Sequence, residues 1–259
     1  MTMIEKNSVM LLIVLASLSG CAKDYGLAPP VGGEKITVTI KVPTDLKPKS
    51  MRIMYRSPVC TFTDHSGSGV AYKREGYQKL DLEPVRLGES DLYEAKLPVD
   101  GGGTCQWRLS NVTFGVLYKN PAQFGENVIY GAGGGVVVVF DHNKPSRSGS
   151  SIEVEGDLTI KKDYYPWVSE TFLGGYVKRV SLIGAGDIYL GYEAKHAKKV
   201  YFEPVLHPGF ILRSVGVKEK KDGNYPAFTF PDGSIVADGR PEASFLKLQA
   251  IRKAAEAKQ

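Results

Sequence analysis

Hydrophobic and polar side chains alternate with a period of two along much of this chain. Between residues 36 and 42, Ile36, Val38 and Ile40 take every second position, and Thr or Lys takes the positions between them. Successive side chains of a strand point to opposite faces, so this alternation predicts a strand with one buried face and one exposed face.

Similar short segments recur along the chain and are separated by Gly and Pro, as is typical of strands joined by turns. The pattern predicts a mainly β fold, with antiparallel sheets arranged as a sandwich or as a barrel-like structure. The expected strands lie at 51–55, 80–82, 92–97, 107–118, 152–160, 177–183, 199–205, 210–217 and 227–236.

Two features indicate how the chain is divided. The continuous apolar run Val136–Phe140 favours a strand that is buried on both faces, and the polar segment 142–151 follows it as the best candidate for a boundary or a long loop. We therefore expect one β domain over 35–141 and a second β unit over 152–259. Whether they are separate domains stays open at this point.

The end of the chain has helical periodicity. From Ala243 onward, apolar side chains recur three or four positions apart at Phe245, Leu248 and Ile251, while Lys and Arg occupy the opposite side. This spacing predicts an amphipathic C-terminal helix. Packing of its apolar stripe onto a sheet is favoured over a role at a membrane surface.

The first twenty residues have the layout of a signal peptide. A charged, polar start precedes an apolar run at 9–18, which is too short to span a bilayer comfortably. The run ends in Leu18, Ser19, Gly20 and Cys21, a tetrapeptide that resembles the processing site of bacterial lipoproteins.

This resemblance implies that residues 1–20 are removed and that Cys21 carries acyl chains. Each buried methylene contributes roughly 0.8 kcal/mol, so several acyl chains on one residue anchor a protein stably. Ala22 follows where an Asp is typical of retention in the inner membrane, so we expect an outer-membrane anchor with the domain facing the periplasm. Residues 21–34 contain Pro and Gly without apolar periodicity, and we expect them to form the lipidated residue and a flexible tether.

The charge of the chain is mild and scattered. It contains 33 basic and 28 acidic residues, a net charge of +5, and removal of residues 1–20 leaves this value unchanged because Glu5 and Lys6 cancel. The basic runs at 195–199 and 218–221 are interpreted as solvated loops. A nucleic acid is therefore not an expected partner.

With Cys21 assigned to lipid, Cys60 and Cys105 are the remaining cysteines. An exported protein meets an oxidising compartment, where paired thiols become disulfides. We therefore predict a Cys60–Cys105 bridge that pins the first β domain. Two Cys and four dispersed His do not form a recognisable ligand set, so neither a metal nor another cofactor is expected.

Patterns of catalytic residues are weak in this sequence. Asp64, His65 and Ser66 are the residue types of a hydrolytic triad, but a triad requires convergence in space, and adjacent loop residues do not usually form the relay. No Gly-x-Ser-x-Gly motif surrounds Ser66. The aromatic residues gathered at 164–176 favour core packing over a ligand platform. We expect a protein that is not an enzyme.

Two cysteine-bearing segments carry a resemblance to a known family. The segments 54–60 (MYRSPVC) and 101–111 (GGGTCQWRLSN), with the expected strand pair at 225–237, resemble enterobacterial lipoproteins associated with type VI secretion loci. In particular they resemble β-rich immunity lipoproteins, which implies binding and neutralisation of a secreted phospholipase effector. The alternative function is that of a structural or accessory lipoprotein that binds other proteins of the envelope or of the secretion apparatus.

The polar segment 64–74, expected as a loop after the first Cys, is the candidate partner-binding site. Asp64, His65, Tyr72 and Arg74 are its candidate contact residues, since aromatic and Arg side chains dominate the energy of many interfaces. A disulfide at the base of the loop would reduce the entropy that the loop loses on binding.

Replacing the lipidation residue tests the N-terminal assignment. In Cys21→Ser we expect an unprocessed precursor, because the thiol is the attachment point of the lipid, and intact mass measurement of the membrane fraction checks this. An unmodified mature wild-type protein would contradict the prediction.

Overall fold

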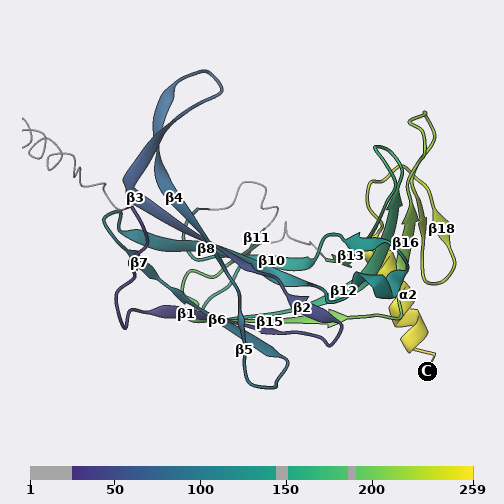
Figure 1. Ribbon diagram of the computed structural model, residues 1–259, viewed down its shortest axis with the longest axis horizontal. Coiled ribbons are helices and arrows are strands. Elements are labelled where there is room, and N and C mark those ends of the chain that lie inside the picture. Colours follow the sequence, from purple (N-terminus) through teal and green to yellow (C-terminus); the bar gives the residue numbers. More distant parts are fainter. Residues whose placement is uncertain (1–24, 144–150, 186–190, 259) are drawn as a thin grey trace, which may run out of the picture.

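The structure is a computed structural model and describes residues 25–143, 151–185 and 191–258. The expected processing site, Leu18, Ser19, Gly20 and Cys21, lies outside the described residues. Strands dominate, as predicted, and they form two sheets that pack in a sandwich-like arrangement (Figure 1). Within the described ranges, no helix is both long enough and apolar enough to cross a membrane.

The larger sheet has the order β18-β17-β16-β12-β15-β1-β6-β5, with β13 paired to β12 and β9 paired to β13. Its strands are β1 (Lys35–Lys41), β5 (Val85–Arg86), β6 (Leu92–Pro98), β9 (Val128–Tyr130), β12 (Leu158–Thr171), β13 (Val177–Gly184), β15 (Lys199–Leu206), β16 (Leu212–Val215), β17 (Ala227–Thr229) and β18 (Ile235–Val236).

The smaller sheet has the order β11-β14-β10-β8-β3-β4, with β2 and β7 also paired to β8. Its strands are β2 (Leu46–Pro48), β3 (Met51–His65), β4 (Ala71–Leu82), β7 (Asp100–Gly102), β8 (Trp107–Tyr118), β10 (Gly134–Val139), β11 (Ser151–Glu153) and β14 (Gly191–Glu193). A short 3₁₀ helix, η1 (Pro121–Phe124), precedes β9.

Both sheets combine strands from the two expected β units. In the larger sheet, β1 pairs in parallel with β15, and in the smaller sheet β10 pairs in parallel with β14. The described parts of the segments 35–141 and 152–259 therefore share one main core, and residues 144–150 of the expected boundary lie outside the described residues. The sheets are mixed, whereas the sequence pattern predicted antiparallel pairing.

The buried face of each strand follows its sequence pattern. In β1, Ile36, Val38 and Ile40 are buried between the sheets, as the alternation predicted. All residues of β10 are buried, which confirms the strand predicted from the run beginning at Val136. Consecutive aromatic residues of β12 divide between two cores, because Tyr164 belongs to the main core and Tyr165 to a smaller one.

The smaller core lies beneath the C-terminal helix, α2 (Phe245–Glu256), which confirms the predicted amphipathic helix. The Ser244 side chain caps the helix by accepting a hydrogen bond from the backbone of Lys247. Leu248 is buried against the sheet, and Arg252 Nε donates to the hydroxyl of Tyr165 at 2.9 Å. The helix thus packs its apolar stripe onto the larger sheet.

Tyr164 fills the space between the sheets by lying against two glycines. A Cβ atom at Gly134 of β10 would come 2.4 Å from the Tyr164 ring, and one at Gly184 of β13 would come 2.6 Å from it. Only a residue without a side chain allows this approach. The ring is fully buried and meets Phe202 edge-on with 6.4 Å between centroids.

Substitution of Gly134 tests this packing. In Gly134→Ala we expect the free energy of unfolding to fall by about 1–3 kcal/mol, because the added methyl group displaces the Tyr164 ring in a packed core. Urea denaturation measures the change. Gly209→Ala is the matched control, since no atom lies within 4 Å of its added Cβ. Equal stability of the two variants would contradict the prediction.

Candidate functional site

A long hairpin formed by β3 and β4 projects from one end of the sandwich (Figure 1). β3 pairs with β8 only from Arg52 to Arg56, so beyond this point the hairpin continues as a two-stranded ribbon. The expected loop at 64–74 was wrong in extent, because both strands run almost to the tip and only residues 66–70 form the turn. The segment 64–74 is polar and lacks the alternation typical of a strand, because both faces of the ribbon are exposed to solvent.

A β-bulge at the base of the ribbon carries the disulfide. The register between β3 and β4 shifts between Ser57 and Thr61, which places Val59 and Cys60 out of regular pairing. The Cys60 and Cys105 sulfurs are 2.10 Å apart, which confirms the predicted bridge. It links β3 to the turn that precedes β8.

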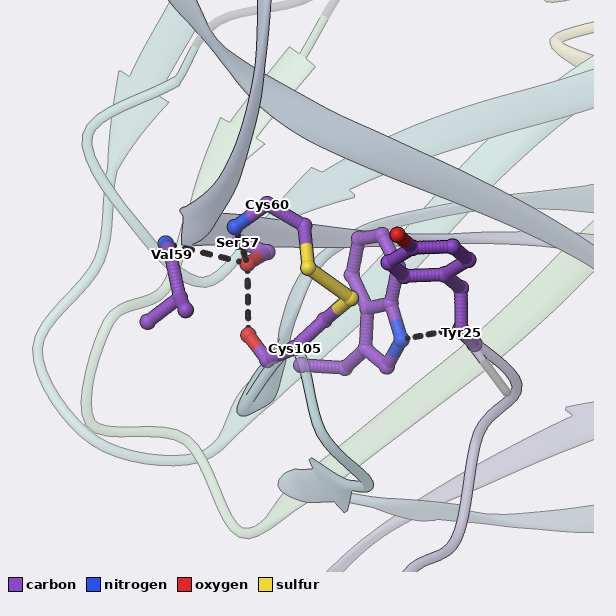
Figure 2. The surroundings of a disulfide bond; sticks show 6 residues. Tyr25, Ser57, Val59, Cys60 and Cys105 are labelled. Carbon is purple, nitrogen blue, oxygen red and sulfur yellow. Dashed lines mark hydrogen bonds between the residues drawn. A yellow bond between two sulfur atoms is a disulfide. The ribbon is translucent and has the colours of Figure 1, made fainter. Parts of the chain in front are cut away.

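Ser57 holds the bulge together from inside. Its buried hydroxyl donates to the Cys105 carbonyl at 2.5 Å and accepts from the backbone N–H groups of Val59 and Cys60 at 3.1 and 2.8 Å (Figure 2). One side chain thereby satisfies two N–H groups of the bulge and the carbonyl of Cys105. Sequence reasoning missed Ser57, whose only signal was its position three residues before Cys60.

The N-terminal segment lies against the same end of the sandwich. Trp107 Nε1 donates to the Tyr25 carbonyl at 2.8 Å (Figure 2). The Ala28 N–H donates to the Gly101 carbonyl at 2.8 Å. Leu27 packs against the main core. Part of the expected tether at 21–34 is therefore docked on the domain from Tyr25 onward.

The glycines at 101–103 permit this docking. A Cβ atom at Gly102 would lie 2.1 Å from the Ala28 carbonyl oxygen, and one at Gly103 would lie 2.5 Å from the Gly26 oxygen. Both glycines also have positive φ angles, which L side chains rarely adopt. The sequence indicated only that Gly separates the expected strands, but these glycines also make room for a neighbouring backbone.

Near the tip, four side chains share one face of the ribbon: Phe62, Asp64, Tyr72 and Arg74, which we call the tip patch. Asp64 is opposite Tyr72 and Phe62 is opposite Arg74 in the strand register. His65 is opposite Ala71 and belongs to the other face, because successive strand residues alternate. The structure thus brings together three of the four candidate contact residues and separates His65 from them.

Polar contacts hold the tip patch in one arrangement. Arg74 Nη1 donates to Asp64 Oδ2 at 2.8 Å, and the Tyr72 hydroxyl reaches the same oxygen at 3.4 Å. The hydrogen bond from Arg74 lowers the pKa of Asp64 below its ordinary value, so the carboxylate stays ionised at neutral pH. The Arg74 guanidinium also lies 5.8 Å from the centre of the Phe62 ring, within the range of a cation–π contact.

An open groove of about 870 Å³ lies at the base of the ribbon beside the disulfide. Aromatic side chains from three separate segments line it, with Tyr25 from the N-terminal segment, Tyr77 from β4 and Trp107 from β8. Phe62 connects the groove to the tip patch, since its ring meets that of Tyr77 edge-on at 5.9 Å.

No protein-family model, curated protein or solved structure matches this chain. The resemblance of the cysteine-bearing segments to immunity lipoproteins therefore stays a prediction.

Removing the disulfide tests the support of the ribbon. In Cys60→Ser/Cys105→Ser we expect the free energy of unfolding to fall by about 4 kcal/mol, because the bridge closes a loop of 45 residues and restricts the unfolded chain. Urea denaturation of the domain in a Cys21→Ser background measures this, with Cys21→Ser alone as the control. Two reactive thiols in unreduced, denatured control protein would show that the bridge does not form.

Proposed function

We propose that this protein is a membrane-anchored lipoprotein of the periplasm that binds and neutralises a secreted effector, and that the tip patch makes the central contact. The observation that carries the proposal is the braced ribbon, which projects from the sandwich and carries aromatic and arginine side chains near its tip. The cysteine-bearing segments support an effector of the phospholipase type through their family resemblance.

The side chains of the tip patch are of the kinds that concentrate binding energy. Tyr and Arg are enriched among the residues whose truncation weakens protein interfaces most. The exposed fraction of Tyr72 is 45%, so its ring is available to a partner while its hydroxyl stays near Asp64. A partner that covers this face would bury the ring and gain hydrogen bonds from the guanidinium of Arg74.

The bracing of the ribbon reduces the cost of binding. An unsupported two-stranded ribbon is marginally stable in water, and ordering it on binding would cost conformational entropy. Here the bridge and the Ser57 hydroxyl hold one end of the ribbon, and the Asp64–Arg74 pair links its strands near the other. The ribbon is consequently ordered before a partner arrives.

Neutralisation then requires only that this protein cover the working surface of the effector. An inhibitor acts by occupying the surface through which the effector reaches its substrate. A lipid anchor raises the local concentration of the inhibitor at the membrane that a phospholipase attacks. Binding to the effector and anchoring at the membrane that the effector attacks together account for this function without a catalytic step.

Truncation of the tip patch tests the proposal. An immunity gene is expected to sit beside the gene of its toxin, so the partner to test is an effector encoded next to this gene. In Tyr72→Ala/Arg74→Ala we expect affinity for that effector to fall about tenfold or more, because interface energy concentrates in such side chains. Calorimetric titration of the mature domain measures affinity, and survival of cells that express the effector measures protection.

Tyr176→Ala is the matched control, because Tyr176 is an exposed aromatic residue on the turn between β12 and β13. Unchanged affinity and protection in the double variant would reject the tip patch as the binding site. If the wild-type domain binds envelope proteins and does not bind the effector, the accessory function replaces neutralisation.

A further inference from the structure

Exposed apolar side chains gather around the groove beside the disulfide, which meets the tip patch at Phe62. The exposed fractions are 54% for Tyr25, 54% for Val59 and 61% for Tyr77. These residues come from the N-terminal segment, the bulge of β3 and the base of β4, and all three line the groove. Such a cluster is a candidate interaction surface.

The covalent chain places this cluster next to the expected anchor. Tyr25 lies four positions after Cys21, and four extended Cα-to-Cα steps span at most about 14 Å. The Tyr25 carbonyl is in turn fixed by its hydrogen bond from Trp107, whose ring lines the groove. If Cys21 is acylated, as the proposed function assumes, this residue lies at the membrane surface. Tyr25, at the edge of the groove, then stays within the same distance of Cys21.

We propose that the groove face is a membrane-docking surface whose occupant is the lipid bilayer itself, in the interfacial layer of headgroups. Tyr and Trp favour this layer because an apolar ring and a polar group are both accommodated there. The anchor and the groove face would then act as two contacts with the same membrane. The proposal rests on the lipid anchor of the proposed function and adds an orientation to it.

Docking would also position the tip patch. From Cys60 to His65 the ribbon advances five residues, or about 17 Å at the rise of a strand. A bilayer that contacts the groove face therefore lies within about this distance of the tip patch. An effector that works on phospholipid would meet the ribbon where it reaches its substrate.

The test uses the full lipidated protein in vesicles that contain an excess of phosphatidylethanolamine over phosphatidylglycerol, with and without bromine on the acyl chains. Single tryptophans are introduced as Val59→Trp and Tyr77→Trp, and Ile235→Trp is the matched control. Ile235 is an exposed apolar residue of β18, at the opposite end of the sandwich from the ribbon (Figure 1). The two native tryptophans are common to all variants, and the unsubstituted protein measures their signal.

We expect brominated lipid to quench the added fluorescence of Val59→Trp and Tyr77→Trp several-fold more than that of Ile235→Trp. Equal quenching in all three variants, or no quenching at the groove in protein that floats with the vesicles, would overturn the docking surface and leave the anchor intact. Intact mass measurement separates the two proposals. Protein that lacks lipid on Cys21 would overturn the anchor and with it the basis of the docking geometry.

Discussion

The bulge at the base of β3 is the constraint on which the projecting ribbon depends. A strand that leaves its sheet loses the neighbouring strand that formed hydrogen bonds with the backbone N–H and C=O groups along one of its edges. In this protein β3 leaves β8 after Arg56, and within four residues the chain has a bulge, a disulfide and a buried hydroxyl that accepts two N–H groups. These features connect the base of the ribbon to the turn before β8. The sandwich therefore holds the base of the ribbon in a fixed position.

The same small region joins elements that are distant in sequence. Cys105 bonds covalently to Cys60, its carbonyl accepts from Ser57, and Trp107 two residues later binds the backbone of Tyr25. The start of the described chain, the base of the ribbon and the first residue of β8 are therefore fixed together. Substitutions at any of these positions should affect the others through contact, and their effects on stability should not add independently.

Local patterns in the sequence predicted local structure well. Strands such as β1 and β10, the final helix and the disulfide followed from periodicity, from apolar runs and from the cysteine count. What the sequence did not predict depends on contacts between distant segments. The parallel pairing of β1 with β15, the role of Ser57 and the docking of Tyr25 leave no periodic signal, and the ribbon strands carry polar residues on both faces. At the candidate site, Tyr72 and Arg74 were identified by residue type, but only the register could show that His65 faces away from them.

The parallel pairing of β1 with β15 has a consequence for the order in which the chain folds. Thr37 is opposite Lys199, so the N-terminal strand cannot take its place until most of the chain has been made. Contacts of such large sequence separation form slowly, because a long loop must close first. The segments around Cys60 and Cys105 are nearer to each other in sequence, and we expect them to meet earlier. The chain would then stay open over much of its length and complete its larger sheet only once its C-terminal third is available.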